Sequence, residues 1–170
     1  KIYFMHGNRD FMISSKICVK YGMELIEDPT LINLHNRRIL LMHGDTLCVD
    51  DIKYQEFRQL VRKKSWQTQM MQKSLEERLM IANTLRKKSI NETTNKDEFI
   101  MDVNEEEVKK CFVRSGAEMI IHGHTHRPMI HEVEIDKQKH KRIVLGDWNT
   151  KSHVFILNKK NTELQEIQLK

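Results

Sequence analysis

The sequence has 170 residues, of which 39% are hydrophobic and 31% are charged, as is typical of one soluble domain with a hydrophobic core. Its formal net charge of +5 favours phosphate groups, nucleic acid and anionic lipid alike, so charge alone does not select a partner. No apolar run approaches the roughly 20 residues of a membrane-spanning helix. The three cysteines, Cys18, Cys48 and Cys111, lack a CxxC spacing and are expected to be reduced thiols of a cytosolic protein, mostly buried.

Three short apolar runs, at residues 2–5, 39–42 and 119–121, share one pattern. Each is followed by a polar turn with glycine, which reads His-Gly-Asn, His-Gly-Asp and His-Gly-His in chain order. Continuous apolar runs of this length are typical of strands that are buried on both faces of a sheet. Their polar turns should therefore meet at one edge of the sheet, where α/β proteins bind ligands. Because the sequence opens directly in such a strand, we expect the parent protein to continue upstream.

The intervening segments have helical periodicity. We expect helices over residues 14–21, 53–64 and 104–115, the last with Asn104 as its N-cap and Gly116 after its end. A longer amphipathic segment over 66–87 places Met71, Leu75, Leu79 and Ala82 on one face. The remainder alternates as strands at 131–135, 142–145, 154–157 and 164–169, with a turn at 158–162. The predicted order is α/β first and a β meander afterwards.

The polar turns carry the residues that point to chemistry. His124 and His126 are two apart in an extended turn, so both imidazoles face one side and can bind a divalent transition metal. Asn8 and His43, at the other two strand ends, would add an amide oxygen and a third imidazole. Arg9 suits a phosphate, whose oxygens its guanidinium matches in pairs. A surface loop rich in histidine is the alternative, and His122 is expected to serve packing or hydrogen bonding.

A pair of adjacent metal ions also needs a bridging carboxylate. Candidates are Asp10, Asp45, Asp50 and Asp51, and none of them occupies a clear bridging position. We therefore expect the bridge to come from outside this sequence.

These blocks resemble the last three of the five motif blocks of the calcineurin-like metallophosphoesterases. The first two blocks, Asp-x-His and Gly-Asp-x-x-Asp, are absent here. Within that superfamily the chain looks most like the UDP-2,3-diacylglucosamine pyrophosphohydrolases of lipid A biosynthesis, in which Arg takes the place of the His that follows Gly-Asn in many other members. The matching stretches are residues 6–11, 41–48, 50–51, 54–58, 100–104, 122–128 and 144–148.

The resemblance implies a metal-dependent hydrolase. Asn8, His43 and His124 should bind one Mn²⁺ and His126 a second, with metal-activated hydroxide attacking the α-phosphorus of UDP-2,3-diacylglucosamine. The products would be UMP and 2,3-diacylglucosamine 1-phosphate. Asn8 and Arg9 would act in catalysis and hold the diphosphate. The other implied substrate-binding residues are Asp51, Ser89, Thr93, Lys96 and His124, and Thr93 departs from the Asn of some members.

The implied fold is an α/β two-sheet sandwich flanked by helices, of which residues 1–170 form the C-terminal part of one domain. A helical lid is expected at about residues 66–99, where methionines would adapt to acyl chains and basic residues would meet the diphosphate or an anionic bilayer. An ordinary amphipathic helix packed on the core is the alternative for this segment. The implied location is cytoplasmic, peripheral to the inner membrane.

Other functions stay open to different degrees. A metallophosphoesterase acting on nucleotides or phosphoproteins is the alternative enzyme, although Arg9 and the 54–58 stretch argue against it. A non-enzymatic scaffold usually loses metal ligands, whereas the expected ones are present here. Nucleic-acid binding is not expected, because no basic stripe is interleaved with aromatic residues. Without the upstream blocks we expect the isolated chain to be weakly active or inactive.

Overall fold

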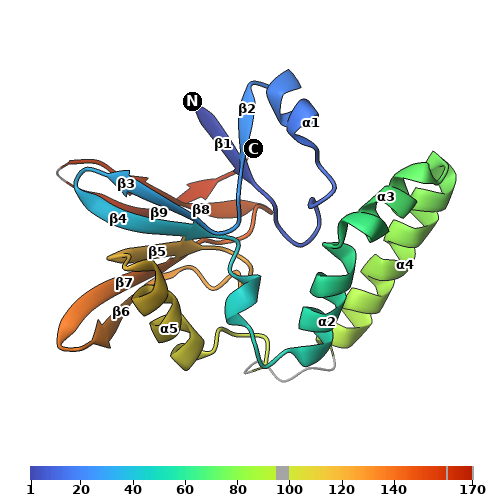
Figure 1. Ribbon diagram of the computed structural model, residues 1–170. Coiled ribbons are helices and arrows are strands. Elements are labelled where there is room, and N and C mark those ends of the chain that lie inside the picture. Colours follow the sequence, from blue (N-terminus) through green and yellow to red (C-terminus); the bar gives the residue numbers. More distant parts are fainter. Residues whose placement is uncertain (95–99, 160, 170) are drawn as a thin grey trace. The chain divides into compact units, whose positions relative to one another are not determined.

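The computed structural model describes residues 1–94, 100–159 and 161–169, except for the side chains of residues 90 and 92–94. The chain divides into two compact units (Figure 1): Lys1–Leu47 together with Val103–Lys170, and Cys48–Asp102. No helix in the described part of the chain is long and apolar enough to cross a membrane.

A five-stranded mixed sheet forms the centre of the larger unit. Its strands are β3 (Thr30–Leu34), β4 (Arg37–Met42), β5 (Met119–His122), β6 (Met129–Ile135) and β7 (Gln138–Val144), in the order β3-β4-β5-β7-β6. The three central strands are parallel, and Met42, His122 and Val144 lie opposite one another at their carboxyl ends. The outer strands β3 and β6 pair antiparallel to their neighbours. Three strand ends therefore open on the same edge, as the sequence predicted for two of them.

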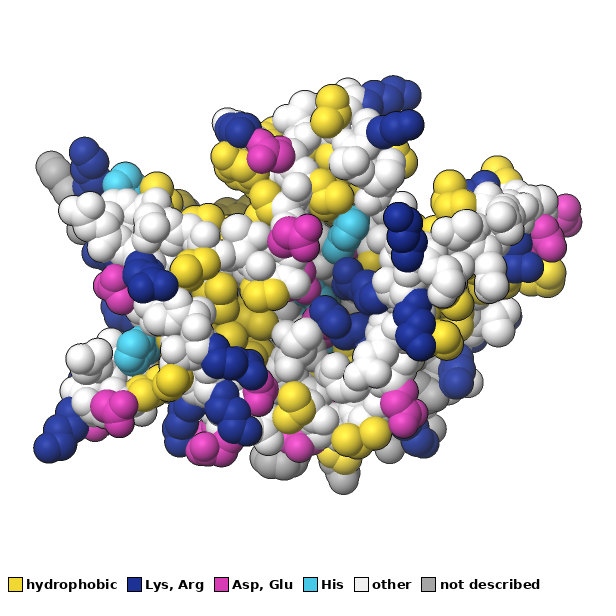
Figure 2. Space-filling view, viewed as in Figure 1, with side chains coloured by type: hydrophobic (Ala, Val, Ile, Leu, Met, Phe, Trp, Pro, Cys, Tyr) yellow, Lys and Arg dark blue, Asp and Glu magenta, His cyan; other side chains and the backbone are white. Residues whose placement is uncertain are grey.

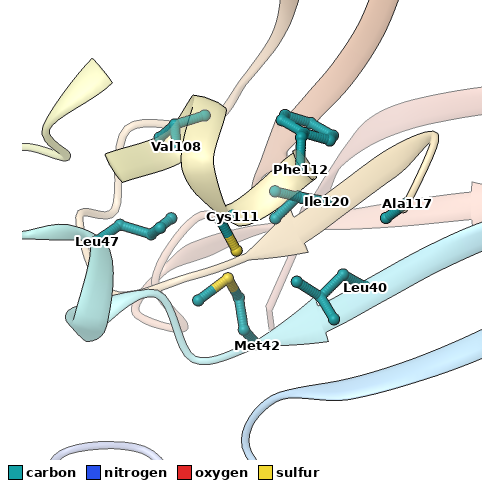
Figure 3. Packing of buried hydrophobic residues seen from close by; sticks show 8 residues of the cluster. All are labelled: Leu40, Met42, Leu47, Val108, Cys111, Phe112, Ala117 and Ile120. Carbon is teal, nitrogen blue, oxygen red and sulfur yellow. The ribbon is translucent and has the colours of Figure 1, made fainter. Parts of the chain in front are cut away.

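One face of this sheet is covered by α5 (Glu105–Ser115). Phe112 is 1% exposed and Ile120 beneath it is fully buried. Figure 3 shows the sulfur atoms of Cys111 and Met42 pointing toward each other in this cluster. Burial raises the pKa of the Cys111 thiol, so that side chain packs as a small apolar group. The cluster comprises Leu40, Met42, Leu47, Val108, Cys111, Phe112, Ala117 and Ile120.

The opposite face packs against an antiparallel hairpin of β8 (Lys151–Leu157) and β9 (Thr162–Gln168). Ile39, Met119 and Ile143 are buried there, and Phe155, Leu157 and Leu164 of the hairpin lie against them. Layers on both faces explain why residues 39–42 of β4 and 119–121 of β5 are continuously apolar rather than alternating. The predicted α/β class with a sheet flanked by helices is confirmed.

A smaller parallel pair stands at the start of the chain. It joins β1 (Ile2–Met5) to β2 (Met23–Ile26) through α1 (Ser15–Lys20), whose N-cap is Ser14. Several apolar side chains of these elements and of the residue after α1 are more than half exposed: Ile2, Tyr3, Val19 and Tyr21. Figure 2 shows hydrophobic side chains on the surface of the protein. The sequence pattern did not predict β2 or β3. Glu24 interrupts the short apolar run of β2, and no residue of β3 is fully buried.

The smaller unit is helical and holds α2 (Ile52–Val61), α3 (Lys64–Gln72) and α4 (Leu75–Thr94). The prediction of a single amphipathic helix over 66–87 is wrong, because α3 ends at Gln72 and a second helix, α4, begins at Leu75. Ser74 and Glu77 form a reciprocal capping box, with the Glu77 N–H 3.2 Å from Ser74 Oγ and the Ser74 N–H 2.8 Å from Glu77 Oε2. Met71, Leu75 and Leu79, which were predicted to share one face of that segment, are 60%, 66% and 56% exposed.

The N-terminus of α5 agrees with the sequence prediction. The Asn104 side-chain oxygen accepts a hydrogen bond of 3.1 Å from the Glu107 N–H, and the Asn104 N–H donates to the Leu47 carbonyl. This residue therefore links the first turn of the helix that covers the sheet to the loop after β4.

Replacing this cap should destabilise the larger unit. We expect Asn104→Ala to lower the free energy of unfolding by about 1 kcal/mol, because an N–H in the first turn loses its acceptor. Asn104→Asp should retain most of the stability, since a carboxylate can accept the same bond. Urea unfolding followed by circular dichroism measures both, with Lys110→Ala on the same helix as the control. Equal stability of the Ala and Asp variants would contradict the capping role.

Candidate functional site

Backbone hydrogen bonds hold the ends of the central strands together. The Gly123 N–H, directly after β5, donates to the His43 carbonyl, directly after β4, at 3.0 Å. The Leu145 N–H, directly after β7, donates to the His122 carbonyl at 2.8 Å. The parallel register is thus continued one residue beyond each strand, so the side chains that follow start from a defined backbone position.

Two of the predicted metal ligands lie side by side at this edge. The imidazoles of His43 and His124 meet edge to face, with ring centroids 5.0 Å apart and planes at 70°. His43 Nε2 and His124 Nδ1 are both shielded from solvent. The structure therefore brings together two imidazoles that are 81 positions apart in the numbered sequence.

The turn after β1 approaches the same place. A Cβ atom on Gly7 would lie 3.3 Å from His43 Cε1, so the backbone next to Asn8 is in close contact with this imidazole. The turn is closed by Asp10, whose carboxylate accepts the Gly7 N–H. Asn8 itself is half-buried and Arg9 is exposed. The amide predicted as a ligand is thus carried by a turn that packs on His43.

Two of the carboxylates considered as bridges have other roles here. Asp10 closes the turn after β1, and Asp51 caps α2 by accepting the Tyr54 N–H at 3.1 Å. Asp45 is fully buried at the start of the short 3₁₀ turn Asp45–Leu47. Asp28 was not predicted from the sequence, and its Oδ1 accepts the His43 N–H at 3.0 Å. The signal available was its position after Leu25 and Ile26, the apolar end of β2.

His122 lies beneath the strand ends and is 1% exposed. Its Nδ1 is 2.9 Å from the Gly123 carbonyl and its Nε2 is 3.1 Å from Arg142 Nη1. Burial, with a smaller contribution from the Arg142 charge, lowers the pKa of His122 to about 4, so the ring is neutral near pH 7. Both nitrogens already contact groups of the protein, in keeping with the predicted role in hydrogen bonding.

The remaining predicted residues are exposed or have side chains outside the described part of the chain. His126 is exposed and has a positive φ of 53°, and Ser89 is exposed on α4. Lys96 and the side chain of Thr93 lie outside the described residues. Across the described ranges, no group of three or more His, Cys, Asp or Glu side chains is arranged to hold a metal ion. The assignments of His126, Ser89, Thr93 and Lys96 stay predictions.

The residues present fit part of a centre for a divalent metal. Two neighbouring imidazoles with buried ring nitrogens and a nearby amide are a mixed nitrogen and oxygen donor set, which suits Mn, Fe or Zn better than Ca or Mg. Between the two histidines of the turn, the buried hydroxyl of Thr125 has no hydrogen-bond partner within the described residues. Buried hydroxyls are normally satisfied, which indicates that a further group completes this turn.

Substitution of Gly44 should disturb this edge more than an ordinary glycine substitution. Gly44 has a φ of 109°, and a Cβ there would lie 2.7 Å from His122 Nδ1. Gly44→Ala should cost about 3 kcal/mol or more, through backbone strain and overpacking together. The matched control is Gly22→Ala, at a φ of 71° with nothing within 4 Å of the added Cβ, which should cost only about 1 kcal/mol of strain. Thermal unfolding of both variants tests this, and equal losses would contradict the close packing of His122 on Gly44.

Comparison with known proteins places this chain in a family. Residues 1–128 match the family described as calcineurin-like phosphoesterase, whose members use divalent metals. A solved structure described as a novel archaeal phosphodiesterase has a TM-score of 0.46 at 12% identity, over 99% of this chain and 68% of that one, and this likeness is too weak to add to the assignment.

Curated relatives named UDP-2,3-diacylglucosamine hydrolase are much more similar in sequence. The protein of Chromohalobacter salexigens is 45% identical over 87% of this chain and 60% of its own length. That of Marinobacter nauticus is 45% identical over 87% and 61%, and that of Proteus mirabilis 43% identical over 95% and 68%. This chain thus spans about 60% of the length of the first two. On this evidence the chain belongs to the calcineurin-like phosphoesterase family.

Proposed function

We propose that the protein hydrolyses the diphosphate bond of UDP-2,3-diacylglucosamine, giving UMP and 2,3-diacylglucosamine 1-phosphate, as a step in lipid A biosynthesis. The observation that carries this proposal is the contact of His43 with His124 at the ends of two parallel strands, beside the turn of Asn8. It occurs in a chain that is 41–45% identical to proteins named for this substrate.

The metal that best agrees with the resemblance is Mn²⁺, with two ions in a complete site. His43, His124 and Asn8 would hold one ion and His126 the other. When bound, a divalent ion supplies Lewis-acid stabilisation of the charge that develops on the phosphate oxygens. The buried ring nitrogens of His43 and His124 suit this role, because imidazole nitrogens are common ligands of divalent transition metals.

Arg9 would recognise the diphosphate. Its side chain is exposed and belongs to the turn that packs on His43, which supports a contact with a ligand bound at the strand ends. In cleavage of a diphosphate the leaving group is itself a phosphate, whose charge needs neutralising more than it needs a proton. A guanidinium provides that charge with paired donors, as a histidine in the same place would not.

The helical unit would supply the remaining substrate contacts, including Asp51, Ser89, Thr93 and Lys96. Four large apolar side chains of α3 and α4 are more than half exposed (Met71, Leu75, Leu79 and Met80), and Figure 2 shows hydrophobic side chains on the surface of this unit. Exposed methionine and leucine side chains suit acyl chains. The exposed basic residues Arg86 and Lys87 would favour an anionic membrane surface, in line with a cytoplasmic location peripheral to the inner membrane.

A substrate comparison tests the proposal. With Mn²⁺ present, a protein of the relatives' length should release UMP from UDP-2,3-diacylglucosamine and should turn over a cyclic nucleotide or an aryl phosphate far more slowly. A chelator should abolish the release and added Mn²⁺ should restore it. The 170-residue chain assayed alongside should be weakly active or inactive. Turnover of only the cyclic nucleotide or the aryl phosphate would reject the proposed substrate in favour of another metallophosphoesterase activity.

Arg9 provides a test at the level of one residue. Arg9→Ala should lower kcat/KM for UDP-2,3-diacylglucosamine about 100-fold, equivalent to about 2.7 kcal/mol of transition-state stabilisation. Arg9→Lys should recover part of this, because it restores the charge but not the paired donors. Lys16→Ala, which removes an exposed cation from α1, is the control and should leave kcat/KM unchanged. A loss no larger than that of the control would show that Arg9 does not contact the diphosphate.

A further inference from the structure

His122 is a buried polar side chain at the strand ends, and neither the proposed metal ligands nor the substrate contacts include it. It is 1% exposed and ends β5, opposite Met42 at the end of β4 and Val144 at the end of β7. His122 therefore lies where the three parallel strands end and their loops begin. A polar group that is buried in such a place is expected to have hydrogen-bond partners and a structural or functional role.

The hydrogen-bond partners determine which nitrogen of the ring carries the proton. Arg142 Nη1 lies 3.1 Å from His122 Nε2, and a guanidinium can only donate. Nε2 must then accept, which leaves the proton on Nδ1. From there it is donated to the Gly123 carbonyl, 2.9 Å away. The ring is thus held from two sides, by a side chain of β7 and by the backbone that follows β5.

The same ring limits how closely the end of β4 can approach. Gly44 lies so near that a Cβ atom on it would be 2.7 Å from His122 Nδ1 and 3.1 Å from His122 Cβ. His43 directly precedes Gly44, and His124 directly follows Gly123. Gly44 and Gly123, the two glycines beside the His122 ring, are therefore the chain neighbours of the two imidazoles that meet at the edge of the sheet.

We propose that His122, oriented by Arg142, is a positioning residue that sets the placement of His43 relative to His124. It acts through the packing of its ring on Gly44 and through its hydrogen bond to Gly123. The inference rests on the proposed function only in taking these two imidazoles as ligands of a divalent ion. It assigns to Arg142, which lies outside the matching stretches, the task of keeping His122 in the required tautomer.

Titration with Co²⁺, followed by its visible absorption spectrum, tests the proposal on the ligands themselves. His122→Ala and Arg142→Met should each weaken Co²⁺ binding about 10–100-fold, as is typical for loss of a group that orients metal ligands. The double variant should be little worse than His122→Ala alone, because Arg142 acts through His122. His122→Asn should recover part of the affinity, because its amide can donate near the position of Nδ1.

A matched control separates positioning from general loss of stability. His140 is a half-buried histidine of β7 whose Nδ1 is 3.1 Å from the Ala117 carbonyl, at the opposite end of the same strands. His140→Asn should lower the melting temperature but leave Co²⁺ affinity and spectrum unchanged. If His122→Ala weakens Co²⁺ binding no more than His140→Asn does, the proposal is overturned.

A second readout needs neither metal binding nor activity. In the metal-free protein, NMR should show that His122→Ala shifts the imidazole resonances of His43 and His124 and speeds hydrogen exchange of the Gly123 amide, which donates to the His43 carbonyl. His140→Asn should change neither. Unchanged His43 and His124 resonances in His122→Ala would reject the positioning role even if the chain bound no Co²⁺. Altered resonances in a protein that does not hydrolyse UDP-2,3-diacylglucosamine would retain the positioning role and reject only the proposed function.

Discussion

The parallel pairing of β4 with β5 and of β5 with β7 is the constraint on which the site depends. Parallel strands end at the same edge, and here the pairing continues past the strands through the hydrogen bond from the Gly123 N–H to the His43 carbonyl. Any slip of β4 against β5 by one residue would turn their apolar side chains to the wrong faces. The cores on both faces of the sheet oppose such a slip, so packing energy is what keeps His43 and His124 adjacent.

Burial on both faces also explains why polar chemistry is confined to the edge. Ile39, Ile120 and Ile143 are fully buried between α5 and the β8–β9 hairpin, and a polar group among them would lack partners. His122 is the exception that lies furthest inside, and it is accommodated because both of its nitrogens contact protein groups. The low pKa of this ring follows from the same burial. The proposed metal ligands lie in the loops that follow the strands.

In the helical unit, local capping rather than burial decides where α4 begins. Its helices carry apolar residues on exposed positions, and its internal boundary is decided by the local capping box of Ser74 and Glu77. A periodicity count runs straight through that boundary, since Met71, Leu75 and Leu79 keep the spacing of one helix. The Ser74–Glu77 capping box overrides this periodicity, because it satisfies N–H groups in the first turn of α4.

The sequence by itself determined the class of fold, the strands that end in His-Gly turns, the cap of α5 and the identity of the candidate ligands. These features follow from local patterns, in which the period of apolar residues and the residues next to glycine carry the information. Only the tertiary structure decided which of those ligands meet. It placed His43 against His124, assigned Asp28 to the His43 N–H, and put the His122 ring between Gly44 and Arg142. No local pattern encodes these contacts, because they join segments that are far apart in the chain and meet only when the strands pair in register.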